Sequence, residues 1–335
     1  MAEPDATSSW FPLNDHPRDK ATFSIRVGVP PPLTVASNGI LVETVQEGAN
    51  TVFVFELDFP MASYLVALGI GELERIVSVS PEGVPMRDYV AVRVGGGVRQ
   101  AFVRQGEMVD FFADLFGPYP FETYGALVFE SEIGSFAALE TQTLSTFPIG
   151  VGAQGYEEFI VAHEVAHQWF RNSLTPGGWQ DIWLNEGFAT YSEWLWSAHV
   201  GEADTLETEV RDVYGLVSGQ QFFDGGISVA QVDDLTDQNF PPVGVPPADN
   251  LFNGAVYLRG GLALHAMLLE VGDEAFFTGL RSYVEQFTYG TVTVSDVIVV
   301  MENAAGQDLT EFFDGWLFVR QIPSIPGMEL VPPEL

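Results

Sequence analysis

The sequence predicts an α+β protein in which a β-rich N-terminal unit precedes a domain of strands and helices. Apolar residues alternate along the first part of the chain, as they do in half-buried strands. From about residue 156 they instead recur every three or four positions, as they do in helices. Strands followed by helices along one chain are typical of an α+β architecture.

Composition indicates a large packed core and excludes several classes of protein. Hydrophobic residues make up 47% of the 335 residues and charged residues 18%, which is typical of a globular protein. The chain has no cysteine, so disulfide scaffolds, thiolate zinc sites and cysteine nucleophiles are excluded. Its formal net charge is −33, from 46 acidic and 13 basic residues. Nucleic acid and an anionic membrane surface are therefore not expected as partners.

Strands are expected mainly in the first 75 residues. Alternating or continuous apolar runs predict them at residues 21–30, 51–59, 64–70, 88–95 and 126–130. Three consecutive prolines, at residues 30–32, end the first of these strands. The first unit is thus predicted to be a β module.

Helices are expected in the second half of the chain. Three-to-four spacing predicts them at about residues 156–170, 192–200, 262–271 and 311–319, and residues 233–253 read as a long irregular loop. No apolar stretch approaches the roughly 18 to 20 residues that span a bilayer. The first ten residues lack the pattern of a signal peptide, which by default favours a cytoplasmic location.

Two metal ligands and a general base are predicted at residues 163–167, which read His-Glu-Val-Ala-His. On a helix, His163 and His167 lie one above the other, so both imidazoles reach one ion. Glu164 is turned by about 100° from His163, which suits a base that takes a proton from a metal-activated water. The alternative for the two histidines is a pair of buried structural side chains.

A third ligand is predicted at Glu186, nineteen residues after His167. A second helix packed on the first would bring its carboxylate to the same ion; the alternative is an acidic residue favoured by the macrodipole at a helix start. Two histidines and a glutamate, with a position left for water, form a catalytic zinc site. We therefore expect one Zn²⁺ per chain, held by His163, His167 and Glu186.

The segment from His163 to Trp196, HEVAHQWFRNSLTPGGWQDIWLNEGFATYSEWLW, resembles the gluzincin aminopeptidases related to aminopeptidase N and puromycin-sensitive aminopeptidase. The family spacing of eighteen residues between the second histidine and the glutamate is met by residues 168–185. Residues 10–20 resemble the later half of the family's N-terminal β domain, and residues 313–323 resemble the end of its thermolysin-like domain.

The resemblance implies a thermolysin-like zinc metallopeptidase catalytic domain preceded by a partial β-sheet domain. We expect the partial β domain at residues 1–75, the catalytic domain at 76–325 and a C-terminal tail at 326–335. The front of the family's N-terminal β domain and its C-terminal helical domain are not matched, so the chain resembles part of a longer family member.

Further site residues follow from the resemblance. The family's glycine-alanine-methionine-glutamate-asparagine motif is matched by residues 137–141 and implies that Glu140 holds the α-amine of the substrate. Tyr257 is similar to the family tyrosine that hydrogen-bonds the oxyanion. Their structural alternatives are a solvated carboxylate and a core tyrosine. Asp181 is a candidate for orienting an imidazole, with an exposed loop acid as the alternative. Arg171 stands where the family usually has glycine.

The resemblance thus implies a zinc-dependent aminopeptidase that removes N-terminal residues from peptides with a free N-terminus. Zinc would activate the water, Glu164 would act as general base and Tyr257 would stabilise the oxyanion. Two alternatives stay open. One is an endopeptidase of thermolysin type that uses the same zinc site, and the other is a catalytically silent interaction module on the same scaffold. The sequence does not indicate an oligomeric state.

Overall fold

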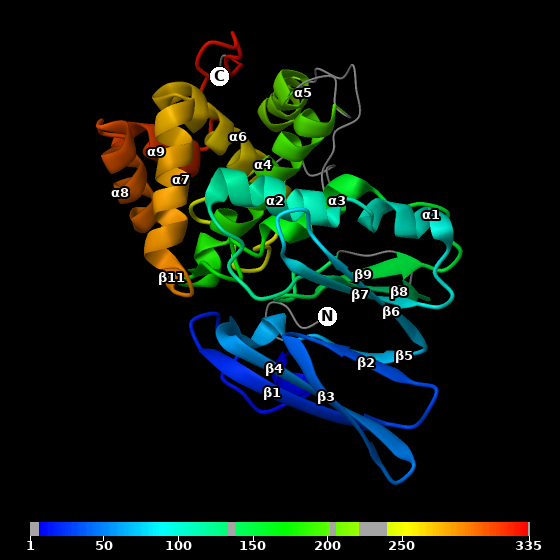
Figure 1. Ribbon diagram of the computed structural model, residues 1–335. Helices are drawn as coiled ribbons and strands as arrows, with labels where there is room; N and C mark the ends of the chain where they lie inside the picture. Colours follow the sequence, from blue (N-terminus) through cyan, green and yellow to red (C-terminus); the bar gives the residue numbers. More distant parts are fainter. Residues whose placement is uncertain (1–6, 133–137, 202–205, 221–239, 334–335) are drawn as a thin grey trace. The chain divides into compact units, whose positions relative to one another are not determined.

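The computed structural model describes residues 7–132, 138–201, 206–220 and 240–333. The chain folds into two compact units, one of residues 1–113 with 118–173 and the other of residues 114–117 with 174–335. Figure 1 shows the strands β1–β7 in blue to cyan and the helices α4–α9 in green to red. Within the described ranges, no helix combines the length and the apolar character needed to cross a membrane.

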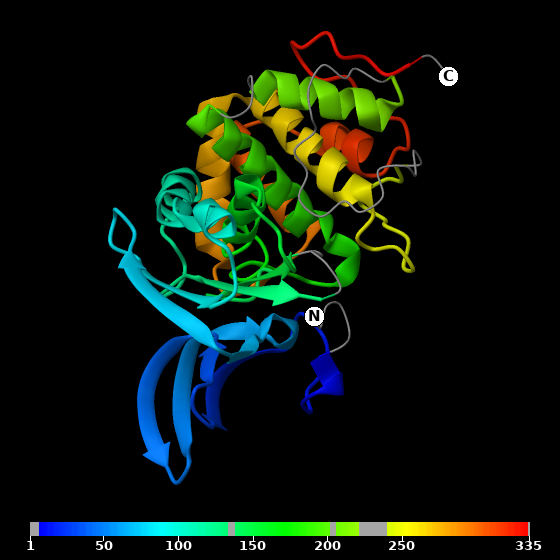
Figure 2. The same cartoon turned by 90° about the vertical axis from the view of Figure 1, so that its right-hand side faces the viewer.

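Two small antiparallel sheets open the first unit. One has the order β1-β4-β3, with β1 (Lys20–Val29), β3 (Ile40–Glu47) and β4 (Asn50–Ala62); the other pairs β2 (Thr34–Ser37) with β5 (Leu68–Gly71). Figure 2 shows the long, twisted strands of the three-stranded sheet. The predicted strands at 21–30 and 51–59 are confirmed as β1 and β4. Alternation places Phe55 and Leu57 of β4 in buried positions.

A four-stranded sheet completes the strands of the first unit within the residues that the structure describes. Its order is β6-β7-β8-β9, with β6 (Leu73–Val79), β7 (Pro85–Ala91), β8 (Ala126–Ser131) and β9 (Ser145–Gly150). The last three strands are parallel and β6 is antiparallel to β7. Tyr89 and Leu127 of this sheet share a buried hydrophobic cluster with Val35 and Phe55 of the smaller sheets. One core therefore serves all three sheets.

Two of the predicted strands are only partly right. The apolar run at 64–70 begins as the 3-10 turn η2 (Ser63–Leu65), and the strand starts only at Leu68. Tyr64 and Leu65 are fully buried in this turn. Their apolar side chains therefore reflect burial, and not a strand conformation. The strand expected at 88–95 ends at Ala91, whereas the one at 126–130 is confirmed as β8.

Helices of the first unit lie along one face of the four-stranded sheet (Figure 1). They are α1 (Gly96–Arg99), η3 (Gln100–Phe102), α2 (Gln105–Phe116, whose end belongs to the second unit) and α3 (Glu158–Ala166), and a 3-10 turn η1 (Thr7–Ser9) lies near the N-terminus. The helix expected at 156–170 is therefore shorter than predicted. His167 is its C-cap, and Arg171 has a φ of 141°, which no helix accommodates.

The second unit is mainly helical. It contains α4 (Trp183–Val200), α5 (Leu206–Ser218), α6 (Gly254–Val271), α7 (Asp273–Phe287), α8 (Val294–Ala305), α9 (Thr310–Leu317), η4 (Trp179–Asp181) and the parallel pair β10 (Thr175–Pro176) and β11 (Thr291–Val292). The predicted helices at 192–200, 262–271 and 311–319 are confirmed within α4, α6 and α9. Of the expected irregular loop, residues 233–239 lie outside the described residues, and 240–253 hold no helix or strand.

Helices α4 and α6 approach each other through two glycines. A Cβ atom at Gly187 would lie 2.8 Å from the Cα of Gly260, and one at Gly260 would lie 2.8 Å from the Cα of Gly187. Only glycine at both positions permits this separation, because the contact on each side is backbone. Gly187 follows Glu186 in the chain and Gly260 lies one turn after Tyr257, so the contact fixes two predicted site residues relative to each other.

A buried histidine on α6 predicts how stability depends on pH. The hydroxyl of Tyr191 on α4 lies 3.2 Å from Nδ1 of His265. Burial lowers the pKa of His265 from 6.5 to about 4, although the charge of Glu207 opposes this shift. Between these pH values the unfolded chain binds the proton and the folded chain does not, so stability falls as pH drops from 6.5 to 4.

We expect His265→Gln to remove this part of the pH dependence. The difference in free energy of unfolding between the variant and the parent, measured with urea in the presence of a chelator, should change between pH 6.5 and 4 and stay constant above pH 7. If the free energies of unfolding of variant and parent differed by the same amount at every pH, the pKa of His265 would be the same in the folded and unfolded chains.

Candidate metal centre

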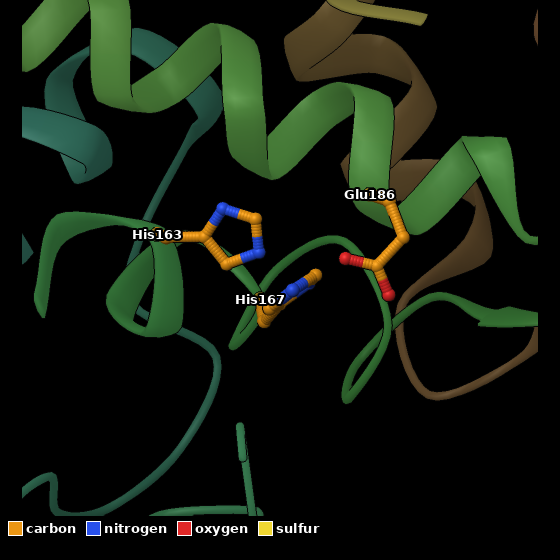
Figure 3. Close-up of side chains that lie close together, drawn as sticks. All are labelled: His163, His167 and Glu186. Carbon is orange, nitrogen blue, oxygen red and sulfur yellow. The ribbon is translucent and has the colours of Figure 1, made fainter. Parts of the chain in front are cut away.

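The structure brings His163, His167 and Glu186 together. Each offers one ligand atom, and these atoms all lie within 4.8 Å of one another. The two histidines come from the last turn and the C-cap of α3, and Glu186 comes from the first turn of α4. Figure 3 shows the three side chains pointing toward one another. All three residues are buried, with at most 2% of their surface exposed.

A backbone carbonyl orients the ring of His167. Its Nδ1 lies 3.1 Å from the carbonyl oxygen of Phe170. Because a carbonyl only accepts, Nδ1 must carry the hydrogen and donate it, which leaves a lone pair on Nε2. A hydrogen bond from the ring nitrogen that does not bind the metal fixes the tautomer and orientation of a metal-binding imidazole. The turn that follows α3 therefore prepares His167 to bind a metal through Nε2.

The donor set fits zinc. Two imidazole nitrogens and one carboxylate oxygen, without sulfur, leave a fourth position of a tetrahedral ion for water or substrate. The rings of the two ligands His163 and His167 pack edge to face, with centroids 4.6 Å apart. Burial strengthens the case, since three polar groups so close together in the interior are stabilised by a shared cation.

Glu164 lies on the same turn of α3 and is fully buried. Its negative charge affects the pKa values of two tyrosines. Burial, and after it the negative charge of Glu164, raise the pKa of the Tyr156 hydroxyl. The same two causes raise the pKa of Tyr124, against a hydrogen bond to Ser145. Both hydroxyls therefore stay protonated in the surroundings of Glu164 at neutral pH.

The segment that carries Glu140 is held against the residues that follow His167. The side chain of Asn172 donates to the carbonyl oxygen of Glu140 at 2.6 Å, and that of Gln168 donates to the same oxygen at 3.4 Å. Gln168 also accepts from the backbone N–H of Thr143 at 2.9 Å. The carboxylate of Glu140 forms an ion pair with Arg171. Ala137, at the start of the predicted motif, lies outside the described residues.

The other predicted residues lie in the second unit. Tyr257 is buried on α6, with 4% of its surface exposed, and Asp181 is buried at the end of η4, with 8% exposed. The exposed loop acid considered for Asp181 is therefore wrong, because the side chain is not exposed. The roles of Tyr257 at the oxyanion and of Asp181 beside an imidazole stay predictions.

Sequence reasoning missed the partners that hold this site. The carbonyl of Phe170 has no side-chain signal, so no motif search could find it. Gln168 and Asn172 lie within the segment that resembles the aminopeptidases, but their partner Glu140 is distant in the chain. Arg171 stood out in the sequence, although its ion pair with Glu140 depends on the fold.

Family models match most of the chain. Residues 101–316 match the peptidase family M1 domain, and residues 1–65 match the peptidase M1 N-terminal domain. The chain belongs to peptidase family M1. The M1 matches agree with the predicted resemblance and with an α+β fold of a β domain followed by a catalytic domain. The boundaries at residues 75 and 325 stay predictions.

Curated M1 relatives are similar to nearly the whole chain. Aminopeptidase M1 of Arabidopsis thaliana is 26% identical over 339 residues, which cover 96% of this chain and 37% of the relative. Aminopeptidase N of Streptomyces lividans is 27% identical over 355 residues, which cover 97% of this chain and 38% of the relative. The chain thus spans little more than a third of the length of these relatives.

Solved structures agree with this assignment. A mutant of the M1 zinc metallopeptidase from Deinococcus radiodurans, bound to a Tyr-Ser-Ala substrate, is 31% identical with a TM-score of 0.83, and the match covers 97% of this chain and 70% of that one. Another structure of the M1 zinc metallopeptidase from the same organism matches with the same identity and TM-score. The family implies Zn²⁺ as the metal, and His163, His167 and Glu186 of this M1 chain are positioned to bind it.

Replacing Glu186 tests the metal centre of this M1 protein directly. We expect Glu186→Gln to weaken zinc binding by more than the roughly 10- to 100-fold loss that follows removal of an outer-shell partner, because an uncharged amide replaces an anionic ligand. Competition with a chromogenic chelator measures the affinity. Glu274→Gln is the control, since Glu274 is an exposed acidic residue in the first turn of another helix, α7. Equal zinc affinity in the two variants would contradict the ligand assignment.

Proposed function

We propose that this chain is a zinc-dependent aminopeptidase that hydrolyses N-terminal residues from peptides. The observation that carries the proposal is the meeting of His163, His167 and Glu186, with Glu164 buried on the same turn of α3 as the first histidine. This arrangement supplies three ligands and one further carboxylate. A structural zinc site would need a fourth ligand and no adjacent base.

Each side chain has a distinct task in the proposed reaction. When held by the three ligands, zinc would supply Lewis acidity toward the scissile carbonyl and would lower the pKa of the hydrolytic water. Glu164 accepts the proton of that water and passes it to the leaving amine. The hydroxyl of Tyr257 donates a hydrogen bond to the oxyanion. Glu140 accepts hydrogen bonds from the N-terminal ammonium of the peptide.

The position of Glu140 supports selection of chain ends. Its backbone carbonyl accepts hydrogen bonds from the side chains of Gln168 and Asn172. Gln168 directly follows the second histidine, His167, and Asn172 lies five residues after His167. A carboxylate that faces the peptide's ammonium at the end of a cleft binds a terminus and disfavours an uncharged chain interior. The proposed substrates are therefore peptides with a free N-terminus.

Zinc content measured beside a panel of aminoacyl chromogenic amides and one unlabelled peptide tests the proposal. We expect about one zinc ion per chain and release of the first residue of the peptide, identified by mass. Cleavage only at interior bonds would favour an endopeptidase with the same metal centre. Absence of both zinc and turnover would favour a catalytically silent module.

A further inference from the structure

Arg171 forms an ion pair with Glu140, the proposed amine-binding carboxylate. Its Nε forms an ion pair with Oε1 of Glu140, and the two side chains are only 1% and 4% exposed. Its guanidinium carbon also lies 5.5 Å from the centre of the Tyr64 ring, a distance at which an aromatic face attracts a cation. The guanidinium is thus held by a carboxylate and an aromatic ring.

The backbone at Arg171 is unusual for a residue with a side chain. Its φ is 141°, in a region that glycine adopts readily and residues with a Cβ atom adopt at a cost. The neighbouring backbone is fixed, because the N–H of Asn172 donates to the carbonyl of His167 at 3.0 Å. Lys20 donates to the carbonyls of Asn172 and Ser173 at 3.1 and 3.0 Å. Arg171 therefore projects from a firmly bonded turn.

The ion pair changes what Glu140 offers to a ligand. An unpaired buried carboxylate attracts an ammonium strongly, because little water screens the charge. A carboxylate already paired with a guanidinium presents almost no net charge, and an approaching ammonium also meets repulsion from the arginine. A substrate ammonium must share Glu140 with Arg171 or displace it, so part of the gain from binding the free amine is lost.

We propose that Arg171 is a specificity-determining residue, which competes with the substrate ammonium for Glu140 and so weakens the preference of the site for charged N-termini. This inference rests on the proposed function, in which Glu140 holds the amine. The preferred class of ligand remains a peptide with a free N-terminus, but its advantage over the same peptide with a neutral, acylated N-terminus is small.

Binding to a variant that does not turn over measures this preference. In the zinc-loaded Glu164→Ala protein, calorimetry compares Tyr-Ser-Ala with N-acetyl-Tyr-Ser-Ala. We expect the ratio of the two affinities to rise at least tenfold when Arg171→Gly is added, because the guanidinium that competes with the ammonium for Glu140 is then removed. Glycine suits the φ of this position, so the variant should fold. If a thermal scan shows that it does not, Arg171→Met takes its place, since methionine keeps a Cβ atom and a long side chain at this position and carries no charge.

A double-mutant cycle separates charge from shape. With Glu140→Gln also present, Arg171→Gly should raise the affinity ratio by at most about threefold, because the shared carboxylate is gone and only the direct repulsion between arginine and ammonium is relieved. Arg104→Gln is the matched control, since it breaks the partly exposed ion pair with Glu158 outside the site.

An affinity ratio that does not rise in Arg171→Gly overturns the role of Arg171, and so does a rise that is equally large without the Glu140 carboxylate. The proposed function is decided separately, by the turnover of the protein that retains Glu164. If the protein turned over peptides but its affinity ratio did not change in Arg171→Gly, the proposed function would stand and the role of Arg171 would be refuted.

Discussion

Replacing Glu164 with glutamine should lower the turnover of aminoacyl amides by about 10²- to 10⁴-fold, the range that a positioned general base contributes. The side chain is fully buried on α3, one residue after a proposed ligand. An amide of the same shape cannot accept a proton from water at neutral pH, whereas it fills the same space. We therefore expect the variant to keep its fold and its zinc, with the loss confined to the rate.

Steady-state kinetics and zinc analysis of the same sample check this expectation. The control is Glu158→Gln, which replaces a glutamate in the first turn of the same helix that pairs with Arg104. It should leave the rate nearly unchanged. Normal turnover in Glu164→Gln would refute the proposed mechanism, and loss of zinc from that variant would instead make Glu164 part of the metal centre.

The metal centre could be predicted from sequence because most of it is local. His163 and His167 are one helical turn apart, so the helix alone brings their rings together. Glu186 needed only a second helix, and α4 provides it. The exact end of α3 could not be predicted, since Trp169 and Phe170 continue the apolar spacing after the helix has stopped. The apolar spacing therefore runs past the end of the helix at Ala166 and does not report where the helix stops.

The fold was predictable where one face of an element is buried. β1 and β4 alternate because one side of each packs on the core. By contrast, β3 and β6 are exposed along most of their length, so they carry no period-two signal and were not expected. The ion pair between Glu140 and Arg171 could not be predicted for a different reason. Both residues were noted in the sequence, but only tertiary structure decides that they meet.

A methyl group at Gly187 should damage the metal centre without touching any ligand. Its Cβ would lie 2.8 Å from the Cα and 3.0 Å from the carbonyl carbon of Gly260. Backbone atoms cannot move aside alone, so α4 and α6 must separate. Overpacking of this kind typically destabilises a protein by about 1–3 kcal/mol. We expect Gly187→Ala to lower the melting temperature and to weaken zinc binding, because Glu186 is the adjacent residue on α4.

Gly96→Ala is the matched control, since a Cβ on this helical glycine of α1 meets no atom within 4 Å. Alanine there should leave stability and zinc affinity unchanged or slightly raise stability. Gly260→Ala should reproduce the effect of Gly187→Ala, because the same backbone contact is blocked from the other side. If Gly187→Ala kept full zinc affinity and lost only stability, the first turn of α4 would hold Glu186 in place independently of α6. The close helix contact would then serve the fold and not the metal centre.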